Sequence, residues 1–261
     1  MNAVAIAVRT FASTPQPLLF WSVAVRNFSA EFAGLESQGL GRRQTGGHRR
    51  RIQHGRDIAP LEAILGLCER FDAALLVDDA HGFGVLGREG RGVLAHFGLD
   101  SPRIVCVGTL GKAAGVSGAF VAGSVDLIEM LIQRSRSYFY MASPPALACA
   151  LMKSLELIEA ESWRRRRLEA LEKRLARAPR RQRWQLARSQ TPIQPLIIGG
   201  SRETVAVSGA LAREGILVPA IRPPTVPADT TRLRISPSVA HSEEDVGRLE
   251  DALQRAEQAS W

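Results

Sequence analysis

The stretch LLVDDAHGFGVLG, residues Leu75–Gly87, decides the fold and raises the first question about function. Its apolar run ends in two carboxylates, Asp78 and Asp79, and His81 follows before the chain breaks into glycines. A short apolar run bounded by glycines is typical of a buried strand. Because a carboxylate is costly to bury unless it is paired, this stretch requires a cationic partner from elsewhere.

The residues around this strand alternate between helical and strand patterns. Apolar positions at helical spacing predict a helix over 59–71, which has a proline near its start. Short strands are predicted over 73–77, 104–107 and 120–122. Helices and strands that alternate, with glycine-rich turns between them, predict an α/β fold with a mostly parallel sheet.

A second pattern follows in the C-terminal half. Leucines at three- and four-residue spacing predict one long helix, or two, over 145–175. Strands are predicted over 193–198, 217–221 and 232–236, and a helix over 204–214. Ser242 and Asp245 resemble a capping box that opens a final helix through Leu253. This half is typical of a smaller α+β domain.

The chain of 261 residues is strongly basic, with a net charge of +8. Such a charge would suit an anionic partner such as nucleic acid. The excess is unevenly placed, however, because six arginines fall within Arg42–Arg56 with no acidic residue between them. In the second cluster, Arg164–Arg167, Glu169 and Glu172 follow at helical spacing, which indicates a solvated helix face. We therefore predict no nucleic-acid partner.

Cysteine usage and hydropathy indicate a cytoplasmic protein. Cys68, Cys106 and Cys149 lie far apart without a CxxC spacing, which predicts free thiols and no metal site. The apolar segment 17–25 is too short to span a bilayer, so no membrane association is expected.

The second chemical signal is VGTLGKAAGVSGAF, residues Val107–Phe120. Lys112 is one of only three lysines, and it alone lies in an apolar, glycine-rich setting after a strand. Desolvation there would lower the pKa of its amine and make the amine nucleophilic. A reactive lysine and a strand-end aspartate together suit pyridoxal phosphate, because the aspartate pairs with the protonated pyridine nitrogen. The protonated ring nitrogen would be the cationic partner that the Asp78 carboxylate requires.

Plainer interpretations stay open. Taken alone, Lys112 fits a surface lysine and His81 fits a turn histidine. Asp78 and Asp79 could bind Mg²⁺, although GTLGK lacks the spacing of a P-loop. The two segments in this order favour pyridoxal phosphate.

Four segments resemble the α-oxoamine synthases, which are pyridoxal-phosphate enzymes of aminotransferase fold type I. They are VDDAHGFGVLGREGRG, GTLGKAAGVSGAF, IQPLIIG and AIRPPTVPADTTRLRIS, and the resemblance extends from about Asp57 to the C-terminus. It implies a partial cofactor-binding large domain over 57–150 and a smaller C-terminal domain over 151–261. It also implies a homodimer.

The resemblance implies a role for each matching residue. Lys112 would be the Schiff-base lysine and later move a proton. Asp78 would pair with the ring nitrogen, His81 would hydrogen-bond the phenolic oxygen, and Thr109 would touch the phosphate.

Two residues of the C-terminal half would bind substrate. Arg234 would hold the amino-acid carboxylate through a bidentate pair, and Thr225 would lie near the substrate. The implied reaction is a decarboxylative condensation of an amino acid with an acyl thioester. IQPLIIG and AIRPPTVP favour the member of biotin biosynthesis, which joins L-alanine to pimeloyl-CoA or pimeloyl-ACP. Glycine C-acetyltransferase, 5-aminolevulinate synthase and an inactive remnant stay open as alternatives.

The resemblance stops before Asp57. In the family a strand ending in FSMDGD runs into the helix that follows, whereas this chain has IQHGRD at 52–57. Codons permitted for Ile52–Arg56, read one base later, encode Phe-Ser-Met-Asp. We therefore predict that residues 1–56 are unmatched and that about 39–56 are an out-of-frame translation, from a frameshift or a sequencing error. A basic linker is the alternative.

Overall fold

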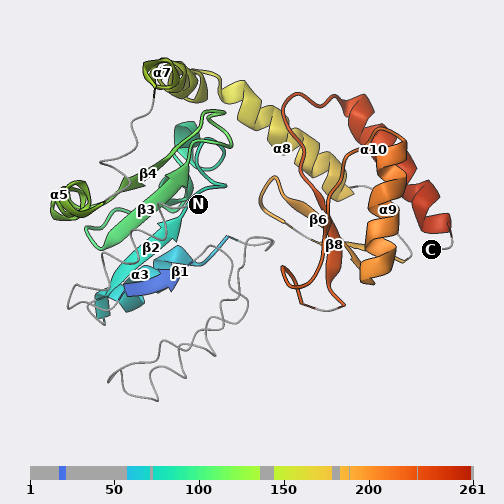
Figure 1. Ribbon diagram of the computed structural model, residues 1–261, viewed down its shortest axis with the longest axis horizontal. Helices are drawn as coiled ribbons and strands as arrows, with labels where there is room; N and C mark the ends of the chain where they lie inside the picture. The colour runs from blue at the N-terminus through green and yellow to red at the C-terminus, as the bar shows by residue number, and fades with distance from the viewer. Residues whose placement is uncertain are drawn as a thin grey trace. The chain divides into compact units, whose positions relative to one another are not determined.

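The computed structural model describes residues 18–21, 58–70, 73–135, 144–177, 183–187, 189–227 and 229–259. They form two compact units, the first containing residues 18–21 and Pro60–Arg165 and the second containing residues 58–59 and those from Arg166 onward (Figure 1). The segment predicted to be out of frame, about 39–56, lies outside the described residues.

The first unit is built on a four-stranded sheet. Its strands are β1 (Leu18–Trp21), β2 (Ala74–Asp78), β3 (Ile104–Thr109) and β4 (Ala119–Ala122), in the order β1-β2-β3-β4. The first three are parallel and β4 is antiparallel to β3. Figure 1 shows β1 (blue) at one edge and β4 (green) at the other. The predicted α/β fold with a mostly parallel sheet is confirmed.

Helices cover parts of this sheet. The buried residues of α3 (Leu61–Arg70) are Leu61, Ile64, Leu65 and Cys68, and α3 contacts β2. Leu127 of α5 (Val125–Arg134) packs in a buried cluster with Leu76, Val105 and Val107. A short helix, α4 (Val93–Phe97), follows the 3-10 turn η1 (Arg88–Gly90). Apolar contacts between β2, β3 and α5 thus hold this helix against the sheet.

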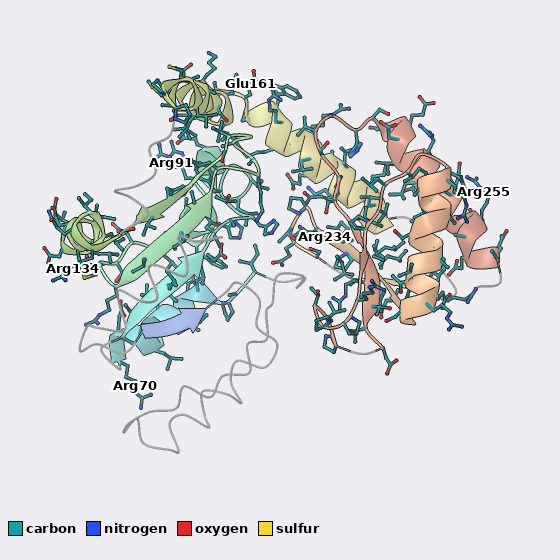
Figure 2. The ribbon with its side chains drawn as sticks, in the orientation of Figure 1. Arg70, Arg91, Arg134, Glu161, Arg234 and Arg255 are labelled. Carbon is teal, nitrogen blue, oxygen red and sulfur yellow. The ribbon has the colours of Figure 1, made fainter. Side chains whose placement is uncertain are left out.

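The predicted helical stretch over 145–175 forms two helices, α7 (Pro145–Ala160) and α8 (Ser162–Arg177). No residue of α7 is buried, although the helix is rich in alanine and leucine. Met152 is 66% exposed and Leu155 is 41% exposed. Figure 2 shows side chains projecting around α7.

The second unit has an antiparallel sheet covered by helices. Its strands are β5 (Gln185–Leu186), β6 (Gln194–Gly199), β7 (Ala220–Ile221) and β8 (Thr231–Ile235), in the order β5-β6-β8-β7. Buried side chains of α8, α9 (Ser201–Arg213) and α10 (Glu243–Gln258) join those of the sheet in one core. Trp184 belongs to this core, is 3% exposed, and donates its indole N–H to Glu203 at 3.2 Å.

The register of β8 separates its apolar residues from its arginines. Leu233 pairs with Leu196 and is fully buried, whereas Arg234 pairs with Pro195 at the next position. Successive side chains of a strand point to opposite faces. Arg234 is therefore on the face of the sheet opposite the helices, where Figure 2 labels it.

The predicted capping box is confirmed. The Ser242 hydroxyl accepts from Asp245 N at 3.0 Å, and Asp245 Oδ2 accepts from Ser242 N at 2.8 Å. The N–H and the hydroxyl of Ser242 both donate to the Asp245 carboxylate, which lowers the pKa of Asp245.

Candidate active site

The predicted site begins where two neighbouring strands end. Asp78 is the last residue of β2 and pairs in register with Val107 of β3, two positions before β3 ends at Thr109. The carboxyl ends of adjacent parallel strands meet at one edge of a sheet, which is where ligands bind in open α/β sheets. Asp78 is half-buried, and its Oδ1 accepts from Ala80 N at 3.0 Å. The topology therefore brings the Asp78 and Lys112 segments to the same edge.

His81 and Lys112 are in direct contact across this edge. Lys112 Nζ lies 3.1 Å from His81 Nε2, a hydrogen-bonding distance between residues 31 positions apart. The contact joins the segment after β2 to the segment after β3. These are the two segments that the sequence singled out for their chemistry.

The predicted desolvation of Lys112 is wrong for the single chain, because both Lys112 and His81 are exposed. The physical reason is local. Lys112 lies beyond the end of β3, between Gly111 and Ala113, whose small side chains give it no cover. The amine is therefore positioned by its contact with His81 and by its loop rather than by burial.

The loop that carries Lys112 is held by several hydrogen bonds. Thr109 Oγ1 accepts from Gly111 N at 3.3 Å and donates to the carbonyl of Gly118 at 3.4 Å. The backbone of Leu110 adds two more bonds, to Gly118 and Val116, both at 2.9 Å. Thr109 was predicted to touch a phosphate, and that role stays a prediction.

A second anchor of the lysine loop comes from α7. The Ser154 hydroxyl donates to the carbonyl of Ala114 at 2.8 Å, and Ala114 is 5% exposed. The sequence offered no signal for this contact, because it joins residues 40 positions apart that share no motif.

Asp79, which the sequence treated only as a possible Mg²⁺ ligand, is 4% exposed. Its Oδ2 accepts from Val93 N at 3.0 Å. Desolvation raises the pKa of Asp79 to about 6; the charge of Asp78 adds to the rise, and the N–H groups of Val93 and Gly82 oppose it. Gly82 and Gly92 both lie against this carboxylate, a relationship that the structure shows and the sequence did not predict.

Arg234 and Thr225, the predicted substrate residues, belong to the second unit. Arg234 is half-buried, and desolvation lowers the pKa of its guanidinium. Among the residues that the structure describes, none forms an ion pair or side-chain hydrogen bond with Arg234. Such a cation suits an anionic ligand. Thr225 is exposed in the turn after β7, where its N–H donates to Arg222 O at 3.0 Å.

The donor set of the first unit fits pyridoxal phosphate. A lysine amine, an imidazole in contact with it and a carboxylate on the neighbouring strand end are the groups that this cofactor requires. Over the described part of the chain, no group of three or more His, Cys, Asp or Glu residues could hold a metal ion. No helix within the described ranges has the length and apolar character needed to cross a membrane.

Comparison with known proteins agrees with this class of site. Residues 57–253 match the family model of aminotransferase class I and II. The chain belongs to the aminotransferase class I and II family.

Its curated relatives carry a more specific name. The 8-amino-7-oxononanoate synthase of Methylobacillus flagellatus is 58% identical over 204 residues, 78% of this chain and 52% of the relative. That of Nitrosospira multiformis is 60% identical over 198 residues, 76% of this chain and 50% of the relative. The resemblance inferred from the sequence is confirmed, and the chain spans about half the length of the curated relatives it matches.

Solved structures share the fold. Serine palmitoyltransferase of Sphingomonas wittichii superposes with a TM-score of 0.73 at 30% identity, covering 79% of this chain and 52% of that chain. The 8-amino-7-oxononanoate synthase of Francisella tularensis gives a TM-score of 0.70 at 24% identity, over 98% of this chain and 78% of that chain. The second likeness supports the fold alone.

Proposed function

We propose that this chain carries the lysine side of the active site of an 8-amino-7-oxononanoate synthase. The reaction is the pyridoxal-phosphate-dependent condensation of L-alanine with a pimeloyl thioester, with loss of carbon dioxide and release of the thiol. The observation that carries the proposal is the 3.1 Å contact between Lys112 Nζ and His81 Nε2, beside the strand that ends in Asp78.

Each residue has a role that follows from its chemistry. Lys112 would supply the amine that holds the cofactor, and it would remove the α proton of the amino acid. Asp78 keeps the ring nitrogen protonated, and His81 donates a hydrogen bond to the phenolic oxygen. Thr109 binds the phosphate. When bound, pyridoxal phosphate supplies the electron sink that stabilises the α carbanion.

The second unit supplies the residues for the substrate. Arg234 binds the carboxylate of L-alanine, supported by its desolvated guanidinium, which has no anionic partner among the described residues. Thr225 lies near the substrate. The α carbon of L-alanine then forms a bond to the thioester carbonyl carbon, and the carbon–sulfur bond breaks.

The setting of the reaction is part of the proposal. We propose a cytoplasmic homodimer that uses coenzyme A or acyl carrier protein as the acyl carrier. The division into a cofactor-binding part over 57–150 and a small domain over 151–261 is likewise a proposal.

The test uses the three lysines of the chain, Lys112, Lys153 and Lys173. Pyridoxal phosphate is added to the wild-type chain and to Lys112→Ala, Lys153→Ala and Lys173→Ala, and the near-visible absorbance is followed. Borohydride reduction and peptide mapping then locate the label. We expect a band in wild type and in the two control variants, with the label on Lys112, and none in Lys112→Ala. A label elsewhere, or no band in any chain, contradicts the proposal.

A second assay tests the substrate. The chain is incubated with L-alanine and pimeloyl-CoA, and the 8-amino-7-oxo acid is sought by mass spectrometry. Parallel reactions with glycine and acetyl-CoA, or glycine and succinyl-CoA, test the other members of the family. Product from either glycine mixture in place of the alanine mixture would overturn the substrate assignment.

A further inference from the structure

Asp79 holds both ends of the loop that contains His81. At the start of the loop, the Asp79 carbonyl accepts from Gly82 N at 3.1 Å and from Phe83 N at 3.0 Å. At its end, Asp79 Oδ2 accepts from Val93 N at 3.0 Å, across 14 residues. One residue therefore closes the segment 80–92 on itself through its main chain and its side chain together.

The packing around the carboxylate leaves little freedom. A Cβ atom on Gly82 would lie 2.0 Å from Asp79 Oδ1, and one on Gly92 would lie 1.9 Å from Oδ2. Both distances are far below any real contact, so the two glycines let the backbone enclose the carboxylate. Asp79 is 4% exposed, so the surrounding atoms restrict the movement of its side chain.

We infer that Asp79 is a positioning residue, whose carboxylate closes the loop 80–92 and thereby holds His81 against Lys112. The inference rests on the proposed function and deepens it. Asp79 acts through His81 and need not touch cofactor or substrate.

The carboxylate has acidic neighbours on two sides. Asp78, the last residue of β2, precedes it directly in the chain, and Cys106 of β3 lies near it. Burial and the charges of Asp79 and Asp78 raise the pKa of the Cys106 thiol to about 12, so the thiol stays neutral. The pKa of Asp79 itself is raised to about 6. When the Asp79 carboxyl loses its proton, the Val93 N–H donates to a charged oxygen. A hydrogen bond to a charged acceptor is stronger than one to a neutral acceptor.

The test observes His81 directly, without cofactor. The full chain is labelled with ¹³C and ¹⁵N in its histidines, and the His81 signal is assigned from His81→Gln. Spectra of wild type, Asp79→Asn, Asp79→Ala and Asp100→Asn are compared through the range around pH 6. Asp100 is exposed after α4 and serves as the charge-matched control.

The imidazole of His81 itself gains and loses a proton in this range, so the expected effect is a difference between chains: the wild-type signal shows an added displacement as Asp79 ionises near pH 6. Asp79→Asn keeps an acceptor oxygen but cannot ionise, so it retains the His81 signal at low pH and lacks the added displacement, whereas Asp100→Asn follows wild type throughout. Asp79→Ala removes the acceptor. It should displace the His81 signal and slow the reaction of Lys112 with pyridoxal phosphate by up to about a hundredfold, the scale expected when a reacting group is misplaced by about 1 Å.

Two results would overturn the inference. One is a folded Asp79→Ala chain whose His81 signal and lysine reactivity match those of wild type. The other applies if Asp79→Ala unfolds, as a random-coil His96 signal would report: a His81 titration curve in Asp79→Asn that superimposes on that of wild type. Failure of the proposed function is distinguishable, because then wild-type Lys112 does not react with the cofactor while the His81 spectra still report on Asp79.

Discussion

The Ser154 hydroxyl of α7 donates a 2.8 Å hydrogen bond to the Ala114 carbonyl, two residues after Lys112. It connects a helix without buried residues to the loop that carries the proposed reactive amine. A neutral hydrogen bond of this kind contributes about 1 kcal/mol to stability. Its larger effect here is on the geometry of the loop.

We predict that Ser154→Ala lowers the free energy of unfolding by about 1 kcal/mol and slows the attachment of pyridoxal phosphate to Lys112. The matched control is Ser208→Ala, because the Ser208 hydroxyl donates a similar hydrogen bond to Val218 O at 2.7 Å in the second unit. That variant should lose similar stability and keep the attachment rate. The attachment rates are measured by stopped-flow absorbance. Equal rates for both variants would show that Ser154 does not influence the reaction of Lys112.

The buried carboxylate of Asp79 predicts a pH dependence of stability. Its folded-state pKa of about 6 lies above the ordinary value of 3.8, so the folded chain binds the proton more tightly than the unfolded chain does. Its contribution is therefore fully present below about pH 4 and is lost as the pH rises through about 6. We expect wild type to lose about 2 kcal/mol relative to Asp79→Asn between about pH 4.5 and about pH 7.5.

Urea unfolding of both chains at the two pH values measures this difference. Asp100→Asn, which changes an exposed aspartate in the same unit, should follow wild type. A difference of the opposite sign would mean that the buried carboxylate is better stabilised in its charged form than its surroundings indicate.

Gly92 predicts a steric effect at the same place. Its φ is +93°, and a Cβ there would lie 1.9 Å from Asp79 Oδ2. We expect Gly92→Ala to destabilise the chain by about 3 kcal/mol or more, from overpacking and backbone strain together. Gly66 lies within α3, and no atom lies within 4 Å of the position that a Cβ would occupy there, so Gly66→Ala should stabilise by about 0.5–1 kcal/mol. Thermal unfolding of the two variants distinguishes local crowding from a general effect of glycine replacement.

Arg234 predicts a defect in substrate binding alone. Replacing its guanidinium by an amide removes a charge-assisted bidentate pair, so Arg234→Gln should raise the KM for L-alanine by about ten- to a hundredfold. Attachment of pyridoxal phosphate to Lys112 should not change. Arg213→Gln, at an exposed position near the end of α9, is the control. A lost absorbance band in Arg234→Gln would show that the arginine supports the fold or the cofactor instead.

The sequence predicted what local patterns determine. The apolar run before Asp78 indicated β2, and Ser242 with Asp245 marked the start of α10. Both signals need only residues close together in the chain. The contact of His81 with Lys112 was within reach because each segment already carried its own chemical signal.

The features that the sequence could not supply depend on residues far apart. The exposure of Lys112 follows from its place beyond the end of β3, between the small residues Gly111 and Ala113, and no segment distant in the chain buries it in the described structure. The bond from Ser154 to Ala114 joins segments with no shared pattern. The closure of the loop by Asp79 needs the positions of Gly82 and Gly92 in space, because a carboxylate beside another carboxylate at a strand end is read first as a metal ligand.

The enclosed indole of Trp184 gives the second unit an optical reporter. Its ring is 3% exposed and its N–H is bonded to Glu203, whereas Trp163, near the start of α8, is 47% exposed. A tryptophan in an apolar interior emits at shorter wavelength than one in water, so loss of this core should appear as a red shift in fluorescence. Trp184→Phe would abolish that shift and identify its source.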